Sequence, residues 1–299
     1  RPVATKMMKI LGVMVIIFVA TGLVASAVML AAVLVFPPAA GVHIAIPAAP
    51  ELATFSAAQQ LVRAFTVPDF PMLLSKNNML ALIVVSMLVG LAASAAGEKG
   101  RAFTLFLDSA KEVMLKLISL VMYYAPVGLC AYFAYLVGVF GPDLLGSYAR
   151  AVAIYYPTAL VYFFLAFTLY AFAAGRTAAV KTFWKNIIPP SVMALATGSS
   201  MAAIPANLQA ADKIGIPRDI SEVVIPVGAT IHMEGSCLAA VLKIAFLFGI
   251  FQMPFTGMET ILTALGIALL TGVVVSGIPG GGTIGELLIL SLYGFPPEA

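Results

Sequence analysis

Residues 189–205 read Pro-Pro-Ser-Val-Met-Ala-Leu-Ala-Thr-Gly-Ser-Ser-Met-Ala-Ala-Ile-Pro, an apolar stretch with helix-breaking prolines at both ends and a polar centre. The charged residues that flank it are Lys185 and Asp212. If both flanks lie on one side of a bilayer, roughly 27 residues must enter and leave on that side, whereas two full spans and a turn need about 40. We therefore expect a re-entrant hairpin whose Gly/Ser tip lines a wet cavity. A single span kinked at Pro205 is the alternative.

The composition of the chain is that of an integral membrane protein. Charged residues make up 10% of the 299 residues and hydrophobic residues 62%. A spanning helix needs about 20 apolar residues, and five runs reach or approach that length: Ile10–Phe36, Met79–Ala96, Leu117–Phe140, Ala151–Ala174 and Ile220–Ile250. The net charge of +3 and the scattered basic residues argue against a nucleic-acid partner. We predict an all-α protein whose surface contacts the lipid bilayer.

The positive charges predict the topology. Basic residues next to spans favour the cytoplasmic side. They precede the first run, separate the second from the third and follow the fourth: Arg1, Lys6 and Lys9; Lys99, Arg101, Lys111 and Lys116; Arg176, Lys181 and Lys185. This pattern predicts a cytoplasmic N-terminus in the cell (inner) membrane. If Lys213 and Arg218 are also cytoplasmic, the segment between Lys185 and Asp212 must leave and re-enter the membrane on one side.

A second apolar segment is interrupted in the same way. The run 260–275 is followed by Ser-Gly-Ile-Pro-Gly-Gly-Gly-Thr at 276–283, and apolar residues resume at 284–292. Four glycines and a proline cannot continue a spanning helix. A pair of interrupted segments points to a transporter binding site near the midplane. Half-helix N-termini suit an anion there, and exposed carbonyls suit a cation.

Two ionisable residues lie within the apolar run between these segments. Residues 224–238 read Val-Ile-Pro-Val-Gly-Ala-Thr-Ile-His-Met-Glu-Gly-Ser-Cys-Leu, with His232 and Glu234 at its centre. Such groups at mid-membrane face a cavity or a partner. Glu234 is either a cation ligand or protonatable site, or a structural hydrogen-bond partner. Because positions i and i+2 diverge on a regular helix, the pair shares a site only if the helix breaks there. Gly228 and Gly235 allow such a break.

Two further charged residues are weaker indications of a functional site. Lys243 lies nine residues beyond Glu234, and we expect its ammonium group to reach the membrane interface. Glu286 follows the second glycine-rich break and is either a lid contact or a solvated helix end.

The ordered set of motifs resembles the dicarboxylate/amino acid:cation symporters, the glutamate transporter family. The set comprises the serine-bearing tip that ends in Pro205, the Gly-Ala-Thr-Ile-x-Met-acid-Gly-Ser break at 228–236, and the Gly-x-Pro-Gly-x-Gly tip at 277–282. Tyr-Ala-Pro-Val-Gly at 124–128 is similar to the family's fifth helix. The resemblance covers essentially the whole chain.

The resemblance implies a glutamate-transporter-like fold with two re-entrant hairpins and a broken transmembrane helix, in a homotrimer that works as an elevator. The implied divisions are helix 3 (1–36, transport domain), an extracellular loop with helices 4 to 6 (37–175), hairpin 1 (176–217), broken helix 7 (218–252) and hairpin 2 (253–295). Helices 4 and 5 are then scaffold, and helix 6 belongs to the transport domain. The family's first two helices and its eighth helix are expected to lie outside this sequence.

The resemblance also implies the site residues. Those matching the family's substrate contacts are Gly198, Ser199, Ser200, Ser236, Ile278 and Gly282. Those matching its cation ligands are Thr21, Gly228, Thr230, His232, Met233 and Glu234. No catalytic residue and no cofactor is implied; the coupling ion is sodium, a proton or both.

The chain departs from the family pattern in its cation-binding motif. The family's Asn-Met-Asp is His-Met-Glu at 232–234, and its tyrosine and serine near Thr21 are Phe18 and Gly22. Imidazole offers nitrogen where sodium prefers oxygen. We therefore expect fewer coupled sodium ions, with Glu234 or His232 carrying a proton instead.

The function predicted from the sequence is secondary active symport of a small anionic or zwitterionic substrate, a dicarboxylate or an acidic or neutral amino acid. The alternative is an ion channel whose re-entrant loops form a selectivity filter. An intramembrane hydrolase using Ser199 or Ser200 with His232 is a weak rival, because Gly-Ser-Ser is not a specific motif. We expect a transporter and not an enzyme.

Overall fold

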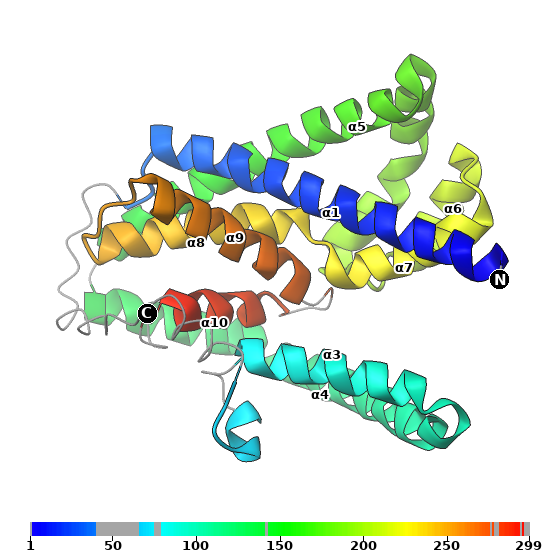
Figure 1. Ribbon diagram of the computed structural model, residues 1–299. Helices are drawn as coiled ribbons and strands as arrows, with labels where there is room; N and C mark the ends of the chain where they lie inside the picture. Colours follow the sequence, from blue (N-terminus) through cyan, green and yellow to red (C-terminus); the bar gives the residue numbers. More distant parts are fainter. Residues whose placement is uncertain are drawn as a thin grey trace. The chain divides into compact units, whose positions relative to one another are not determined.

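The computed structural model describes residues 2–39, 66–74, 79–140, 143–275, 277, 281–293 and 295, and every regular element within these ranges is a helix. The all-α prediction is confirmed for this part of the chain. The molecule divides into two compact units, one formed by Arg1–Gly41 with Ala149–Ala299 and the other by Val42–Tyr148 (Figure 1).

The unit Val42–Tyr148 is an antiparallel helix pair. It contains the short helix η1 (Phe70–Leu74), α3 (Met79–Ala95), the one-turn η3 (Gly97–Gly100) and α4 (Arg101–Phe140). The turn at η3 is tight because Gly100 lies against the carbonyl of Ala93, where a side chain would clash. Many large apolar side chains of α4 are exposed, as expected for helices in lipid.

The other unit contains the remaining helices. They are α1 (Pro2–Val35), α5 (Asp143–Thr197, in this unit from Ala149), α6 (Ile204–Ile214), α7 (Arg218–Ile231), α8 (Glu234–Ile250), α9 (Met258–Val274) and α10 (Gly282–Tyr293). Helix α8 packs against α1, α9 and α10. Its side chains Leu238, Val241 and Ile244 are at most 2% exposed, so α8 is the centre of this unit's core.

Helix α5 bends sharply at Gly175 and Arg176, whose backbone is not helical. The bend is visible in Figure 1 and divides α5 into two arms. Trp184 in the second arm donates a hydrogen bond from Nε1 to the Thr168 hydroxyl in the first, at 2.9 Å. The Trp184 ring also stacks on Phe164, with centroids 5.4 Å apart. These contacts hold the second arm, which leads to the first polar tip.

The two interrupted segments form helix–turn–helix units whose tips touch. The first turn, between α5 and α6, begins at Gly198, whose φ of +60° favours glycine. The second, between α9 and α10, includes Gly277. The carbonyl oxygen of Gly277 accepts hydrogen bonds from the Ser199 hydroxyl at 2.7 Å and from the Met201 amide at 3.2 Å. The structure therefore brings the two polar tips together.

The break between α7 and α8 falls between the two glycines that were expected to allow it. Gly228 is helical in α7 and Gly235 is helical in α8, while His232 is extended and Met233 is not helical. The amide of Met233 donates a hydrogen bond to the Gly272 carbonyl of α9 at 3.1 Å. A backbone group released by the break is thus satisfied by a neighbouring helix.

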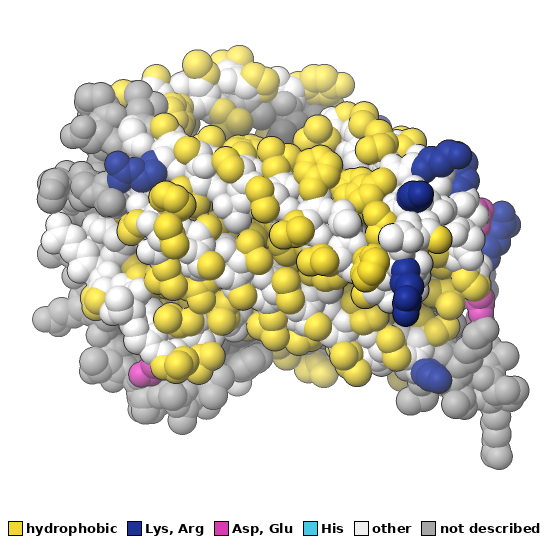
Figure 2. Space-filling model, turned by 90° about the horizontal axis from the view of Figure 1, so that it is seen from above, with side chains coloured by type: hydrophobic (Ala, Val, Ile, Leu, Met, Phe, Trp, Pro, Cys, Tyr) yellow, Lys and Arg dark blue, Asp and Glu magenta, His cyan; other side chains and the backbone are white. Residues whose placement is uncertain are grey.

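Three helical stretches in the described part are long and apolar enough to cross a membrane: Lys9–Val35, Tyr148–Thr197 and Arg218–Ile250. Apolar stretches in α3 and α4, the other two expected spans, are shorter there. Hydrophobic side chains spread over the middle of the face in Figure 2, and most of its visible Lys and Arg side chains lie toward the right-hand end. This distribution is that of a membrane protein.

The close approach of α9 to the break gives a test of the packing. A Cβ added to Gly272 would clash with the Cys237 sulfur and lie 3.3 Å from the Met233 carbonyl oxygen. We expect Gly272→Ala to lower the free energy of unfolding by about 1–3 kcal/mol. In the control Gly266→Ala, on the same helix, the added Cβ meets nothing within 4 Å, and stability should hold or rise by up to about 1 kcal/mol. Thermal unfolding in one detergent compares them; equal melting temperatures would contradict this packing.

Candidate functional site

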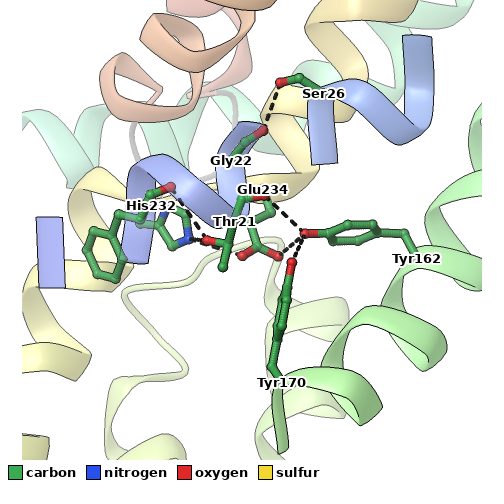
Figure 3. Close-up of polar contacts among 8 residues, drawn as sticks. Thr21, Gly22, Ser26, Tyr162, Tyr170, His232 and Glu234 are labelled. Carbon is green, nitrogen blue, oxygen red and sulfur yellow. Dashed lines mark hydrogen bonds and ion pairs between the residues drawn. The ribbon is translucent and has the colours of Figure 1, made fainter. Parts of the chain in front are cut away.

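The candidate site lies at the break between α7 and α8, where α1 and the first arm of α5 also contribute side chains (Figure 3). Because His232 and Met233 are not helical, His232 and Glu234 point into the same place instead of diverging around a helix. The condition under which the two residues share a site is therefore met.

His232 lies between two oxygen atoms. Its Nε2 is 3.0 Å from the Thr21 hydroxyl and 3.2 Å from Glu234 Oε1. Both the His232 and the Glu234 side chains are largely buried, at 17% and 13% exposure. The Phe18 ring stacks on the imidazole with centroids 4.1 Å apart and planes within 6°, which fixes the ring orientation.

Two departures from the family pattern now have a structural reason. Phe18 is the stacking partner of His232, so these two departures are in direct contact. A Cβ at Gly22 would clash with the end of the Leu269 side chain of α9, so the serine of the family pattern would require that side chain to move. The Gly22 carbonyl instead accepts a hydrogen bond from the buried Ser26 hydroxyl, at 2.8 Å.

Two tyrosines of α5 extend the network and were missed by the sequence analysis. The Tyr162 hydroxyl is 2.8 Å from Glu234 Oε2, 3.3 Å from the Thr21 carbonyl oxygen and 3.0 Å from the Tyr170 hydroxyl. Tyr162 is 5% exposed. The sequence did contain a signal for them, since both phenol groups lie inside an apolar run. A buried tyrosine hydroxyl needs a hydrogen-bond partner, so their position indicated a polar contact in the core.

The distances allow one proton to be held in two ways. When Nε2 of His232 carries hydrogen, it donates to the Glu234 carboxylate. When Nε2 carries none, the same contact requires a hydrogen on Glu234. The single hydroxyl hydrogen of Tyr162 serves one acceptor at a time; when it goes to Glu234, Tyr170 donates in the bond between the phenols. The contact between Nε2 and Glu234 is therefore kept in both states, and only the donor changes.

Of the six predicted cation-site residues, the structure brings the side chains of Thr21, His232 and Glu234 together. The Gly228 carbonyl accepts the His232 amide at 3.0 Å, and the Met233 carbonyl accepts the amides that begin α8. Thr230 is exposed, and its hydroxyl donates to the Val227 carbonyl. Within the described residues no three His, Cys, Asp or Glu side chains form a metal-binding group.

The predicted substrate residues fall into two places. Ser199 is buried at the contact between the tips, and a Cβ on Gly277 would lie 3.1 Å from that of Ser200. Ser236 and Gly282 line a pocket of about 140 Å³ between α8, α9 and α10. Gly198 is exposed at the first tip, and Ile278 lies outside the described residues.

The pocket also contains an ion pair. Lys243 of α8 bonds through Nζ to Oε1 of Glu286 on α10, and both side chains line the pocket. The sequence predicted separate roles for these two residues and gave no sign of their contact. Helical periodicity of α8 places Lys243 on the same face as Ser236, but nothing in the sequence aligned α10 with that face.

Comparison with known proteins identifies the family. Residues 3–299 match the model of the Sodium:dicarboxylate symporter family. A C4-dicarboxylate transport protein of Rhodopseudomonas palustris (strain BisB18) is 29% identical over 218 residues, which are 73% of this chain and 48% of that protein. A proton/sodium-glutamate symport protein of Bacillus subtilis (strain 168) is 28% identical over 225 residues, 75% of this chain and 52% of that protein. The chain thus spans about half the length of these relatives. It belongs to the sodium:dicarboxylate symporter family.

Proposed function

We propose that this chain forms the cation- and substrate-binding part of a secondary active symporter that imports small dicarboxylates or acidic or neutral amino acids. The observation that carries the proposal is the Thr21–His232–Glu234–Tyr162 network, held at a broken helix in an otherwise apolar core. A family match over nearly the whole chain and relatives named as transport proteins support it.

The two tips provide the substrate site in this proposal. Gly198, Ser199, Ser200 and Ile278 are its contacts at the tips, Ser236 and Gly282 contribute from the pocket between α8, α9 and α10, and the second tip acts as a lid. The bonds from the Ser199 hydroxyl and the Met201 amide to the Gly277 carbonyl close the tips together, so a substrate that binds there must exchange for them. The helix–turn–helix units are proposed to be re-entrant hairpins in an elevator, and the assembly to be a homotrimer in the inner membrane with a cytoplasmic N-terminus.

A proton fits the centre of the network better than a sodium ion does. Sodium takes oxygen ligands, but the Thr21 hydroxyl and the Glu234 carboxylate both face the nitrogen of His232. A proton needs only the exchange between His232 and Glu234. We therefore propose that protons contribute to coupling at this position, with sodium bound elsewhere or fewer sodium ions bound.

Uptake driven by separate gradients tests the function and its coupling. In proteoliposomes we expect saturable uptake of a labelled C4-dicarboxylate or amino acid that requires an inward cation gradient. A pH gradient alone should support uptake. Complete dependence on sodium, with no drive from the pH gradient, would remove the proton from the proposal. Ion current that no substrate concentration saturates would favour the channel.

The phenol of Tyr162 gives a residue-level test. We expect Tyr162→Phe to slow coupled uptake by roughly tenfold or more, because a hydrogen bond to a charged group contributes about 1.5–3 kcal/mol. Tyr156→Phe is the matched control: Tyr156 lies on the same helix, is exposed and packs through its ring on Tyr155. Its uptake should equal that of the wild type. Equal rates for both variants would exclude Tyr162 from coupling.

The side of the membrane on which each end of the first interrupted segment lies tests the re-entrant geometry. Lys185 and Lys213 are exposed and flank the first tip, so Lys185→Cys and Lys213→Cys should react with an impermeant thiol reagent from the same compartment. The background should lack Cys130, which is exposed, and Cys237. Labelling from opposite compartments would mean that residues 186–212 cross the membrane once.

A further inference from the structure

The ion pair between Lys243 and Glu286 is separate from the Glu234 network. Lys243 lies two and a half turns along α8 from Glu234, and Glu286 lies one turn into α10. Both side chains remain accessible, at 41% and 48% exposure. The pair lies inside an apolar stretch, where a charge needs a partner or a polar cavity.

The pair borders a pocket built from small residues. On α8, Ser236, Ala239, Ala240 and Lys243 face it; on α10, Gly282, Gly285 and Glu286 do so. The spacing i, i+3, i+4, i+7 is that of one helix face in α8. The pocket volume of about 140 Å³ is well below the roughly 300–1,000 Å³ of sites for drug-sized ligands. The pocket therefore suits a molecule of a few heavy atoms.

The polar side chains of the pocket are one cation, one anion and the hydroxyls of Ser236, Tyr155 and Thr271. The Thr271 hydroxyl donates to the Ile267 carbonyl of its own helix at 2.8 Å. None of the hydrogen bonds made by the described side chains uses the Ser236 hydroxyl, whereas the Tyr155 hydroxyl is bonded to the Gly235 carbonyl at 3.2 Å. A ligand with one carboxylate and one ammonium group can replace the pair charge for charge, with carboxylate on Lys243 and ammonium on Glu286. A dicarboxylate brings two negative charges to a pocket that has one cation and already contains Glu286. Unpaired charge in apolar surroundings is strongly unfavourable.

We propose that Lys243, Glu286 and Ser236 form a subsite that binds the zwitterionic part of a small amino acid in preference to a dicarboxylate. The inference rests on the proposed symport function and specifies its substrate class. The subsite has one charged contact on α8 and one on α10. A bound zwitterion would therefore connect the two helices, as the ion pair does when no ligand is bound.

Isothermal titration of the purified protein with L-serine and, separately, with succinate measures both affinities and tests the subsite. The wild type should bind L-serine at least about tenfold more tightly than succinate. Glu286→Gln should weaken the binding of L-serine by about tenfold or more and strengthen the binding of succinate, because the pocket then has a net positive charge. Lys243→Met should weaken both. The exposed Lys181→Met serves as a control and should change neither.

A purely structural ion pair gives a different pattern. If the pair only clamps α10 to α8, both variants would lower the melting temperature, and Glu286→Gln would weaken L-serine and succinate binding alike; that result for Glu286→Gln would overturn the inference. The charge-swapped double variant Lys243→Glu/Glu286→Lys keeps a neutral pair and should keep its preference for L-serine. Tight succinate binding unaffected by Glu286→Gln would overturn the subsite but leave symport standing. Binding of neither ligand, together with no gradient-driven uptake of either, would overturn both.

Discussion

The hydrogen bond from the Met233 amide to the Gly272 carbonyl holds the helix break on which the rest of the site depends. A backbone amide without a hydrogen-bond partner in an apolar core is energetically unfavourable, and the Gly272 carbonyl of α9 provides the partner for the Met233 amide. With the break in place, α7 ends at Ile231 and α8 begins at Glu234, so two residues that a continuous helix would separate meet one another. Gly272 makes the approach possible, because a side chain there would clash with Cys237.

The network around Glu234 connects parts of the chain that are far apart in sequence. Thr21 comes from α1, Tyr162 from α5 and His232 from the break, and each contacts the carboxylate or its neighbour. The acid is therefore held on both oxygen atoms, one by the imidazole and one by a phenol. A change in the protonation of Glu234 would alter the hydrogen-bond roles of His232 and Tyr162 together, so it would reach α5 as well as α7 and α8.

The sequence was sufficient for the features that follow from local chemistry. Prolines and glycines marked both interrupted segments, and the pair of acid and imidazole within an apolar run marked the broken helix. The sequence did not show where the break would fall, since Gly228 and Gly235 are both helical and the non-helical residues lie between them. Contacts between distant helices were also hidden. Tyr162 and the Lys243–Glu286 pair depend on how α5 and α10 pack against α8, which no spacing within a single segment reveals.

Within the described residues, the Gly277 carbonyl joins the two tips, and this has a consequence for how tightly they stay closed. Because one acceptor takes both the Ser199 hydroxyl and the Met201 amide, separating the tips releases two donors at the same point and only one acceptor. A carboxylate oxygen arriving at that point meets a ready-made pair of donors, so the loss of the tip contact and the gain of an anionic guest involve the same two hydrogen atoms. In the proposed symporter, parting of the tips and capture of an acid group are thereby coupled, and the tips stay closed when no substrate is bound.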